Sequence, residues 1–123
     1  MAGENQLVHI DVIIVDGQAI AFEDSSGTIS GAAGFENDVK MSASGDDFSS
    51  RKRVPRGLKA KLQFGPTTDP ATFAKMSGVA IAMRDSFTGR KCLAPKCNFK
   101  SMGEIGGGTV DIEFNLLSEL QWL

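Results

Sequence analysis

The sequence contains no tyrosine, a single histidine, a single tryptophan and only two cysteines among 123 residues. So few histidines and cysteines leave little material for a nucleophile with its base or for a four-ligand zinc site. No apolar run approaches the roughly 18 residues that a membrane helix needs, so we expect no membrane insertion. The N-terminus, MAGENQLVHID, lacks the basic and apolar regions of a secretory signal, and we expect folding in the cytoplasm.

Catalytic chemistry finds no support in the residues present. His9 falls on the polar side of a predicted strand, and nothing nearby in the sequence would orient it as a general base. The serines form no G-x-S-x-G elbow. The triplet Gly106–Gly108 precedes a strand rather than a helix, which favours a turn over a phosphate-binding loop. We therefore expect no enzyme activity, no catalytic residue and no cofactor.

The two cysteines, Cys92 and Cys97, lie five residues apart. On one continuous strand an odd spacing sends the two thiols to opposite faces, where they share neither a disulfide nor a metal ion. A bulge at Pro95 would change that geometry, but too few further ligands exist to complete a metal site. We expect reduced, structural thiols and no metal.

Charge is present in quantity but unevenly distributed. The net charge is only −2, yet residues 1–50 hold nine acids and one base, residues 51–100 hold twelve bases and two acids, and residues 101–123 hold four acids and no base. Segments of opposite sign can fold against each other within one subunit or pair between copies.

Short alternating segments dominate the chain and predict β-strands. In the first hairpin, over residues 7–22, we place Val8, Ile10, Val12 and Ile14 on the core face. Further strands are predicted over residues 28–41 with a break near Gly34, and over residues 58–64, 79–85, 90–99 and 109–115.

Two of these strands have a clear apolar face, and one helix lies between them. Leu58, Ala60, Leu62 and Phe64 share one face of the first strand, and Val110, Ile112 and Phe114 share one face of the second. Thr68 or Asp69, followed by Pro70, predicts the start of a short helix within residues 67–78. The pattern indicates a mainly β fold: one domain over residues 1–123, a two-sheet β-sandwich or barrel-like domain with one short α-helix and a long charged loop.

The long charged loop begins the stretch Ser42–Lys61, SASGDDFSSRKRVPRGLKAK. Because the alternating strand begins at Leu58, the excursion itself is Ser42–Arg56. A solvated loop is one interpretation. Its clustered cations also suit a nucleic-acid footprint, although interleaved aromatic residues are missing and the sequence pI is near 5.3. A third interpretation is contact with an acidic surface of a neighbouring copy.

The order of these elements resembles the tail tube proteins of long-tailed bacteriophages, most closely the compact tube proteins of Mu-like phages. The resemblance rests on an N-terminal hairpin, the charged loop between two strands, the helix with an Asp-Pro start, the turn FTGR and the final GGTVDIEF. It implies a structural virion protein of the tail, assembled in the host cytoplasm. Such subunits form hexameric rings that stack into a hollow tube, which conducts DNA without binding it specifically.

The resemblance also implies partners and contact residues. The subunit binds copies of itself, with sheath, tape measure and tail terminator proteins as further partners. In this family the long loop reaches the adjacent ring, and terminal segments contact neighbours. The loop contacts carried onto this sequence are Asp46, Asp47, Phe48, Arg51, Lys52, Arg53 and Arg56. Candidates for terminal docking, or for covering their own core, are Leu120, Trp122 and Leu123.

A lumen lined by acids would repel the DNA backbone, and Asp11, Asp111 and Glu113 are the candidates on the polar faces of the strands. Two alternatives stay open. One is a small β-domain that binds a partner or nucleic acid through residues 51–61, and the other is a tube protein of the type VI secretion kind.

Overall fold

The computed structural model describes residues 5–123; residues 1–4, which open the segment considered for a secretory signal, lie outside the description. Within residues 5–123, ten strands and one short helix follow one another. They are β1 (Val12–Val15), β2 (Gln18–Ala19), β3 (Thr28–Ser30), β4 (Phe35–Lys40), β5 (Phe48–Arg53), β6 (Arg56–Gln63), α1 (Pro70–Ala74), β7 (Ser77–Arg84), β8 (Lys91–Met102), β9 (Thr109–Leu116) and β10 (Gln121–Trp122).

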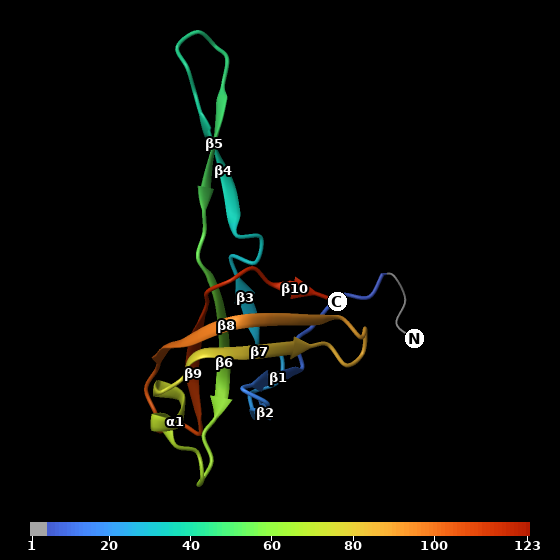
Figure 1. Ribbon diagram of the computed structural model, residues 1–123, viewed down its shortest axis with the longest axis vertical. Coiled ribbons are helices and arrows are strands. Elements are labelled where there is room, and N and C mark those ends of the chain that lie inside the picture. The colour runs from blue at the N-terminus through green and yellow to red at the C-terminus, as the bar shows by residue number, and fades with distance from the viewer. Residues whose placement is uncertain (1–4) are drawn as a thin grey trace.

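Eight of the strands form one antiparallel sheet in the order β2-β1-β7-β8-β9-β6-β3, with β10 paired to β8. The sheet bends on itself, so that β1, β7 and β8 cross β6 and β9 and the two layers enclose the core (Figure 1). The remaining strands, β4 and β5, make a separate two-stranded sheet. The mainly β, sandwich-like fold with one short helix is confirmed, and the described strands form no closed barrel.

The core lies between the two crossing layers. Alternate residues of β6 and β9 are buried as the sequence predicts, because one face of each strand is apolar and the other polar. The apolar residues of β7 and the first half of β8 cover them from the other side. The buried members are Ile13, Val15, Leu58, Ala60, Leu62, Phe73, Ile81, Met83, Cys92, Ala94, Cys97, Val110, Ile112, Phe114, Leu116 and Leu120.

The first strand shows the opposite parity from the predicted one. Ile13 and Val15 are buried, whereas Val12 and Ile14 are only partly covered. All four residues of β1 are apolar, so the alternation holds no information about which side faces the core. The turn at Asp16 and Gly17, both with positive φ, is confirmed and joins β1 to β2.

The prediction for the cysteines is wrong in one respect. On β7, Val79 pairs with Cys97 and Ile81 pairs with Ala94, so three steps on β8 oppose two on β7. The bulge adds one residue and reverses the parity of β8 beyond it. Cys92 and Cys97 therefore both face the core, as free and buried thiols.

Helix α1 is shorter than predicted but begins where the sequence indicates. Asp69 is its N-cap and accepts a hydrogen bond from the Ala71 N–H (3.0 Å), and Pro70 occupies the first turn. Phe73 anchors the helix to the core. No helix in residues 5–123 has the length and apolar character needed to cross a membrane.

Candidate interaction surfaces

Strands β4 and β5 form an arm, residues 35–53, that projects away from the two-layered body (Figure 1). Six residue pairs, from Phe35 opposite Arg53 to Lys40 opposite Phe48, hold the two strands together. The predicted loop Ser42–Arg56 is therefore half strand: residues 42–47 are the tip, and β5 occupies Phe48–Arg53. Almost every side chain of the arm is exposed, so its apolar residues have nothing to pack against within the subunit.

One face of the arm satisfies its own charges. Lys52 Nζ lies 2.9 Å from Glu36 Oε1 and 3.4 Å from Asp38 Oδ2. The hydrogen bond to Glu36, and then that to Asp38, raises the pKa of Lys52 above its usual value. Residues 35–53 contain four acids and four bases, so the arm as a whole carries no net charge. The three bases of β5 and Lys40 are thus balanced by two acids of β4, Glu36 and Asp38, and two acids of the tip, Asp46 and Asp47.

The opposite face of the arm combines apolar and cationic side chains. Arg51 stacks on Phe35, with the guanidinium carbon 3.9 Å from the ring centroid. By strand register, Arg53 and Val39 share this face. Neither Arg51 nor Arg53 forms an ion pair with any residue in the range 5–123. Exposed apolar groups beside unpaired arginines are typical of a protein contact surface.

The base of the arm is tightly packed backbone. Gly31 has φ +64°, and a side chain there would collide with the carbonyl of Pro55. Gly34 has φ +78°, and a side chain there would meet the Arg56 guanidinium. The Val54 N–H donates to the Gly34 carbonyl (2.9 Å), which ties the two sides of the base together. Arg56, predicted as a contact of the loop, thus lies at the base and not on the projecting part.

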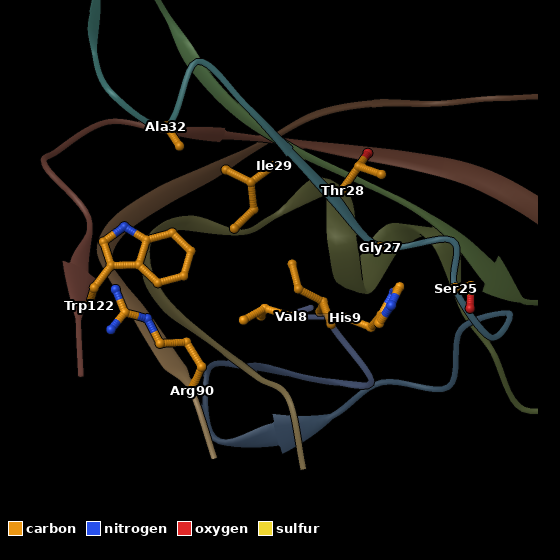
Figure 2. Close-up of a pocket in the computed structure, with 10 residues that line it drawn as sticks. Val8, His9, Ser25, Gly27, Thr28, Ile29, Ala32, Arg90 and Trp122 are labelled. Carbon is orange, nitrogen blue, oxygen red and sulfur yellow. The ribbon is translucent and has the colours of Figure 1, made fainter. Parts of the chain in front are cut away.

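Beside β10 the body carries an open groove of about 630 Å³. We call it the terminal groove; it is shown in Figure 2 and lined by Val8, His9, Ile10, Ser25, Gly27, Thr28, Ile29, Ala32, Arg90 and Trp122. The lining comes from four separate parts of the chain: the N-terminal segment, the stretch around β3, the residue before β8, and β10. No local sequence motif predicts this groove, because only the fold brings these segments together.

Arg90 and Trp122 form one wall of the terminal groove (Figure 2). The Arg90 guanidinium carbon lies 5.2 Å from the Trp122 ring. Trp122 is 41% exposed, as expected for an aromatic side chain placed on a rim. Reciprocal backbone hydrogen bonds between Lys91 and Leu123 (2.9 and 3.2 Å) hold the end of the chain against β8. Of the predicted docking residues, Leu120 covers its own core, whereas Trp122 and Leu123 stay exposed.

The opposite wall is held by a buried carboxylate. Asp85 accepts hydrogen bonds from the N–H groups of His9 (2.9 Å) and Phe87 (2.9 Å), which fastens the N-terminal segment to the β7–β8 turn. The hydrogen bond from His9 is the main cause that lowers the pKa of Asp85, and burial opposes it. Asp11 makes the same connection nearby, because it accepts from the Ser86 N–H (2.9 Å).

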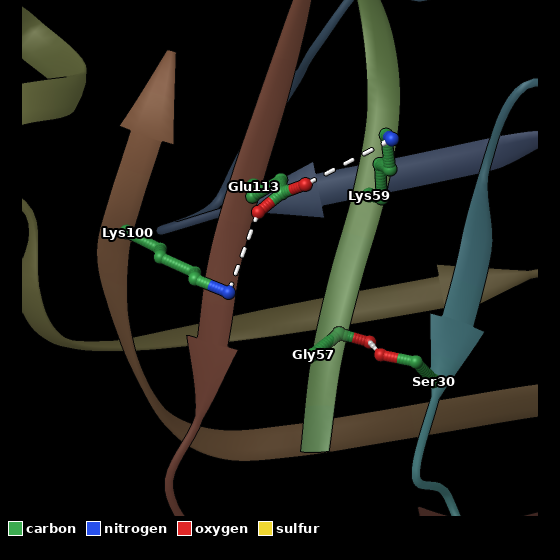
Figure 3. A network of polar contacts seen from close by, with 5 residues as sticks. All are labelled: Ser30, Gly57, Lys59, Lys100 and Glu113. Atoms are coloured by element: carbon green, nitrogen blue, oxygen red, sulfur yellow. Dashed lines mark hydrogen bonds and ion pairs between the residues drawn. The ribbon is translucent and has the colours of Figure 1, made fainter. Parts of the chain in front are cut away.

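A balanced polar ladder covers the outer face of β6 and β9 (Figure 3). Glu113 lies 3.5 Å from Lys100 Nζ and 3.9 Å from Lys59 Nζ. Asp111 is opposite Lys61 in the strand register. Of the three acids predicted for a lumen, Asp111 and Glu113 thus share one face with lysines, and Asp11 lies elsewhere. The basic residues 51–61 are likewise divided: Arg51, Lys52 and Arg53 lie on the arm, Arg56 at its base, and Lys59 and Lys61 on this ladder.

The two thiols, Cys92 and Cys97, are buried in the core. Burial raises the pKa of Cys97 to about 11 and also raises the pKa of Cys92, so both stay protonated near neutrality. The Cys97 thiol donates to the Ala94 carbonyl (3.4 Å). Among residues 5–123, no group of three or more His, Cys, Asp or Glu side chains is arranged to hold a metal ion.

No protein-family model and no curated protein sequence matches the chain. Solved structures do match it in fold. A chain of the extended sheath–tube complex of the PVC extracellular contractile injection system superposes with a TM-score of 0.65 at 9% identity, covering 96% of this chain and 90% of that one. A chain of the PVC sheath/tube terminator in the extended state gives 0.69 at 9% identity, covering 100% and 99%.

A third similar structure is the tube-terminating cap of the anti-feeding prophage, with a TM-score of 0.65, 9% identity, and coverage of 100% of this chain and 94% of that chain. At this identity the likeness concerns the fold. The chain therefore has the fold found in tube and terminator assemblies of contractile injection systems over its full length.

Proposed function

We propose that this protein is a structural subunit that polymerises with copies of itself into a hollow tube. The observation that carries the proposal is the arm, which exposes apolar residues and unpaired arginines on a body with the fold of tube and terminator proteins. An isolated two-stranded hairpin is at best marginally stable in water. Contact with a second subunit would supply the packing that the arm lacks in the monomer.

In the tube that we propose, the subunits form hexameric rings that stack along one axis, as in tail tubes of the Mu-like kind. A heterologous contact repeated by a screw operation produces an open tube. Residues 1–123 act as one tube-type domain, and the arm residues Asp46, Asp47, Phe48, Arg51, Lys52 and Arg53 contact a neighbouring subunit. Sheath, tape measure and terminator proteins are the further partners, and the location is the tail of a virion or a related injection particle.

The outer face of β6 and β9 is our candidate for the lumen surface. It is polar, and its acids Asp111 and Glu113 alternate with lysines. A surface of mixed charge and low net charge holds neither DNA nor a protein cargo tightly, which suits conduction. Asp11, bound to Ser86, would serve the body of the subunit instead.

Negative-stain microscopy of purified protein, combined with light scattering, tests the proposal. We expect stacked rings or hollow tubes that lengthen with protein concentration. Single rings that never stack would favour a terminator role, which two of the similar structures make a specific second candidate. A monomer that persists at high concentration over a range of pH and salt would refute both roles.

A further inference from the structure

The terminal groove has the chemistry of a receptor for an acidic, aromatic segment. Val8 is half exposed, and Ile29 and Trp122 supply further apolar surface around the opening (Figure 2). Arg90 adds a positive charge that stacks on Trp122 and forms no ion pair within residues 5–123. Tryptophan and arginine are enriched among residues that dominate binding energy.

The tip of the arm has the complementary chemistry. Asp46 and Asp47 precede Phe48, whose side chain is 65% exposed, and Met41 on the other side of the tip is 86% exposed. Neither aspartate forms an ion pair with a described residue. The tip therefore offers an aromatic ring and two free carboxylates on the same short segment.

We propose that the terminal groove of one subunit receives residues 46–48, where the tip of the arm meets β5, from a second copy of this chain. Phe48 packs against Val8, Ile29 and Trp122. The carboxylates of Asp46 and Asp47 pair with Arg90. The inference rests on the proposed self-assembly and adds to it the surface on which the arm lands.

Only another copy can supply this occupant. The arm extends away from the body, so its tip lies far from the groove of its own subunit (Figure 1). The five steps between the six paired residues of each strand, at about 3.4 Å per step, give the paired part of the arm a length of roughly 17 Å. That reach carries the tip clear of its own body and onto a neighbour.

Disulfide trapping tests the contact directly. Ser44→Cys at the tip is mixed in equal amounts with Ala32→Cys at the groove and oxidised mildly; a disulfide requires the two Cα atoms to come within about 7 Å. The native cysteines are buried and give no background. We expect the mixed dimer on a non-reducing gel. Pairing Ser44→Cys with Lys75→Cys, an exposed position after α1, is the matched control and should give little product.

Charge exchange tests the pairing chemistry. Arg90→Glu alone, or Asp46→Lys with Asp47→Lys alone, should weaken self-association by about tenfold in sedimentation, and combining them should restore it. Arg84→Glu makes the same change outside the groove and should not be rescued by the tip lysines. Phe48→Ala should weaken association by roughly ten- to a hundredfold. Because Phe48 lies on the arm and remote from the core, this variant keeps the test valid if the Arg90 variants fail to fold.

The outcomes separate this inference from the proposed function. Tubes without trapped dimers and without charge rescue would overturn the groove as receptor and leave the tube role intact. Trapped dimers with charge rescue, in a protein that forms neither rings nor tubes, would support the groove and refute the tube role. A failure of trapping, rescue and assembly together overturns both.

Discussion

Removal of the arm should abolish the proposed assembly and leave the folding of the body intact. Replacing residues 36–52 with an Asn-Gly turn joins Phe35 to Arg53, which already face each other across the hairpin. Asn-Gly suits a two-residue connection between antiparallel strands. The glycines at the base and the hydrogen bond between Val54 and Gly34 remain in place. The shortened protein should therefore keep its folded body and fail to form the polymer that we propose.

The expected change in stability is small because the arm buries almost nothing against the body. None of the core side chains belongs to β4 or β5. The connection between β3 and β6 shrinks from residues 31–55, which is 25 residues, to 10 after 17 are removed and two are added. Loop closure then favours the variant by about 0.8 kcal/mol, from three-halves RT times the logarithm of 25/10. We expect the free energy of unfolding to stay within about 1 kcal/mol of the parent.

Urea denaturation at a concentration where both proteins are monomeric measures the stability, and microscopy measures assembly. Ile112→Ala provides the contrast, because Ile112 is fully buried and its truncation should cost about 2–5 kcal/mol. A loss above about 2 kcal/mol on removing the arm would mean that the arm supports its own subunit. Tubes of normal length from the armless protein would refute the arm as a contact between subunits.

Three further predictions concern the body. The pKa of Cys97 is raised in the native state, so the native protein keeps this thiol protonated while the unfolded chain releases the proton near pH 9. The free energy of unfolding should therefore fall between about pH 9 and 11, and a Cys97→Ser variant should lack that part of the decline. A decline of equal size in the variant would contradict the assignment. The pKa of Asp85 is lowered in the native state, so its carboxylate stabilises the fold above the unfolded pKa of about 3.8, and this contribution disappears as the pH falls through the lower native value. Asp85→Asn should remove that acid dependence and speed amide exchange at His9. Unchanged exchange would count against the hydrogen bond from the His9 N–H to Asp85 as the link that holds the N-terminal segment. Gly31→Ala should lower the free energy of unfolding by at least about 1–2 kcal/mol, because positive φ and the Pro55 carbonyl both oppose a side chain there. Gly45→Ala, at the open tip of the arm, should lower it by less. Equal losses in thermal or chemical melts would show that the backbone near Gly31 shifts to accept a side chain at little cost.

The sequence predicts those strands well in which one face is apolar and the other polar. In β6 the lysines alternate with Leu58, Ala60 and Leu62, so the pattern indicates both the strand and its inward face. In β1 every residue is apolar, and only the pairing with β7 decides that Ile13 points inward. Periodicity thus works where solvent covers one face and loses its information elsewhere.

Features set by the pairing between strands were not readable in the sequence. The segment Phe48–Arg53 is polar or charged at nearly every position and becomes a strand because β4 lies opposite it. The parity of Cys97 depends on a bulge fixed by register with β7. The charged excursion of the candidate site was visible as composition, whereas the terminal groove, assembled from four separated segments, had no local signal.

Because the base of the arm is tightly packed, a small rotation of the backbone there moves the far end of the arm by a larger distance. Over a length of about 17 Å, a rotation of roughly 5° at Gly31 and Gly34 would displace the far end by about 1.5 Å, which is enough to misalign an aromatic side chain with its pocket. In the assembly that we propose, alignment between neighbouring subunits would therefore depend on residues that touch no neighbour. Errors of this kind would also accumulate from one subunit to the next, so the straightness of a long polymer would depend on the rigidity of two glycine turns and the Val54 hydrogen bond.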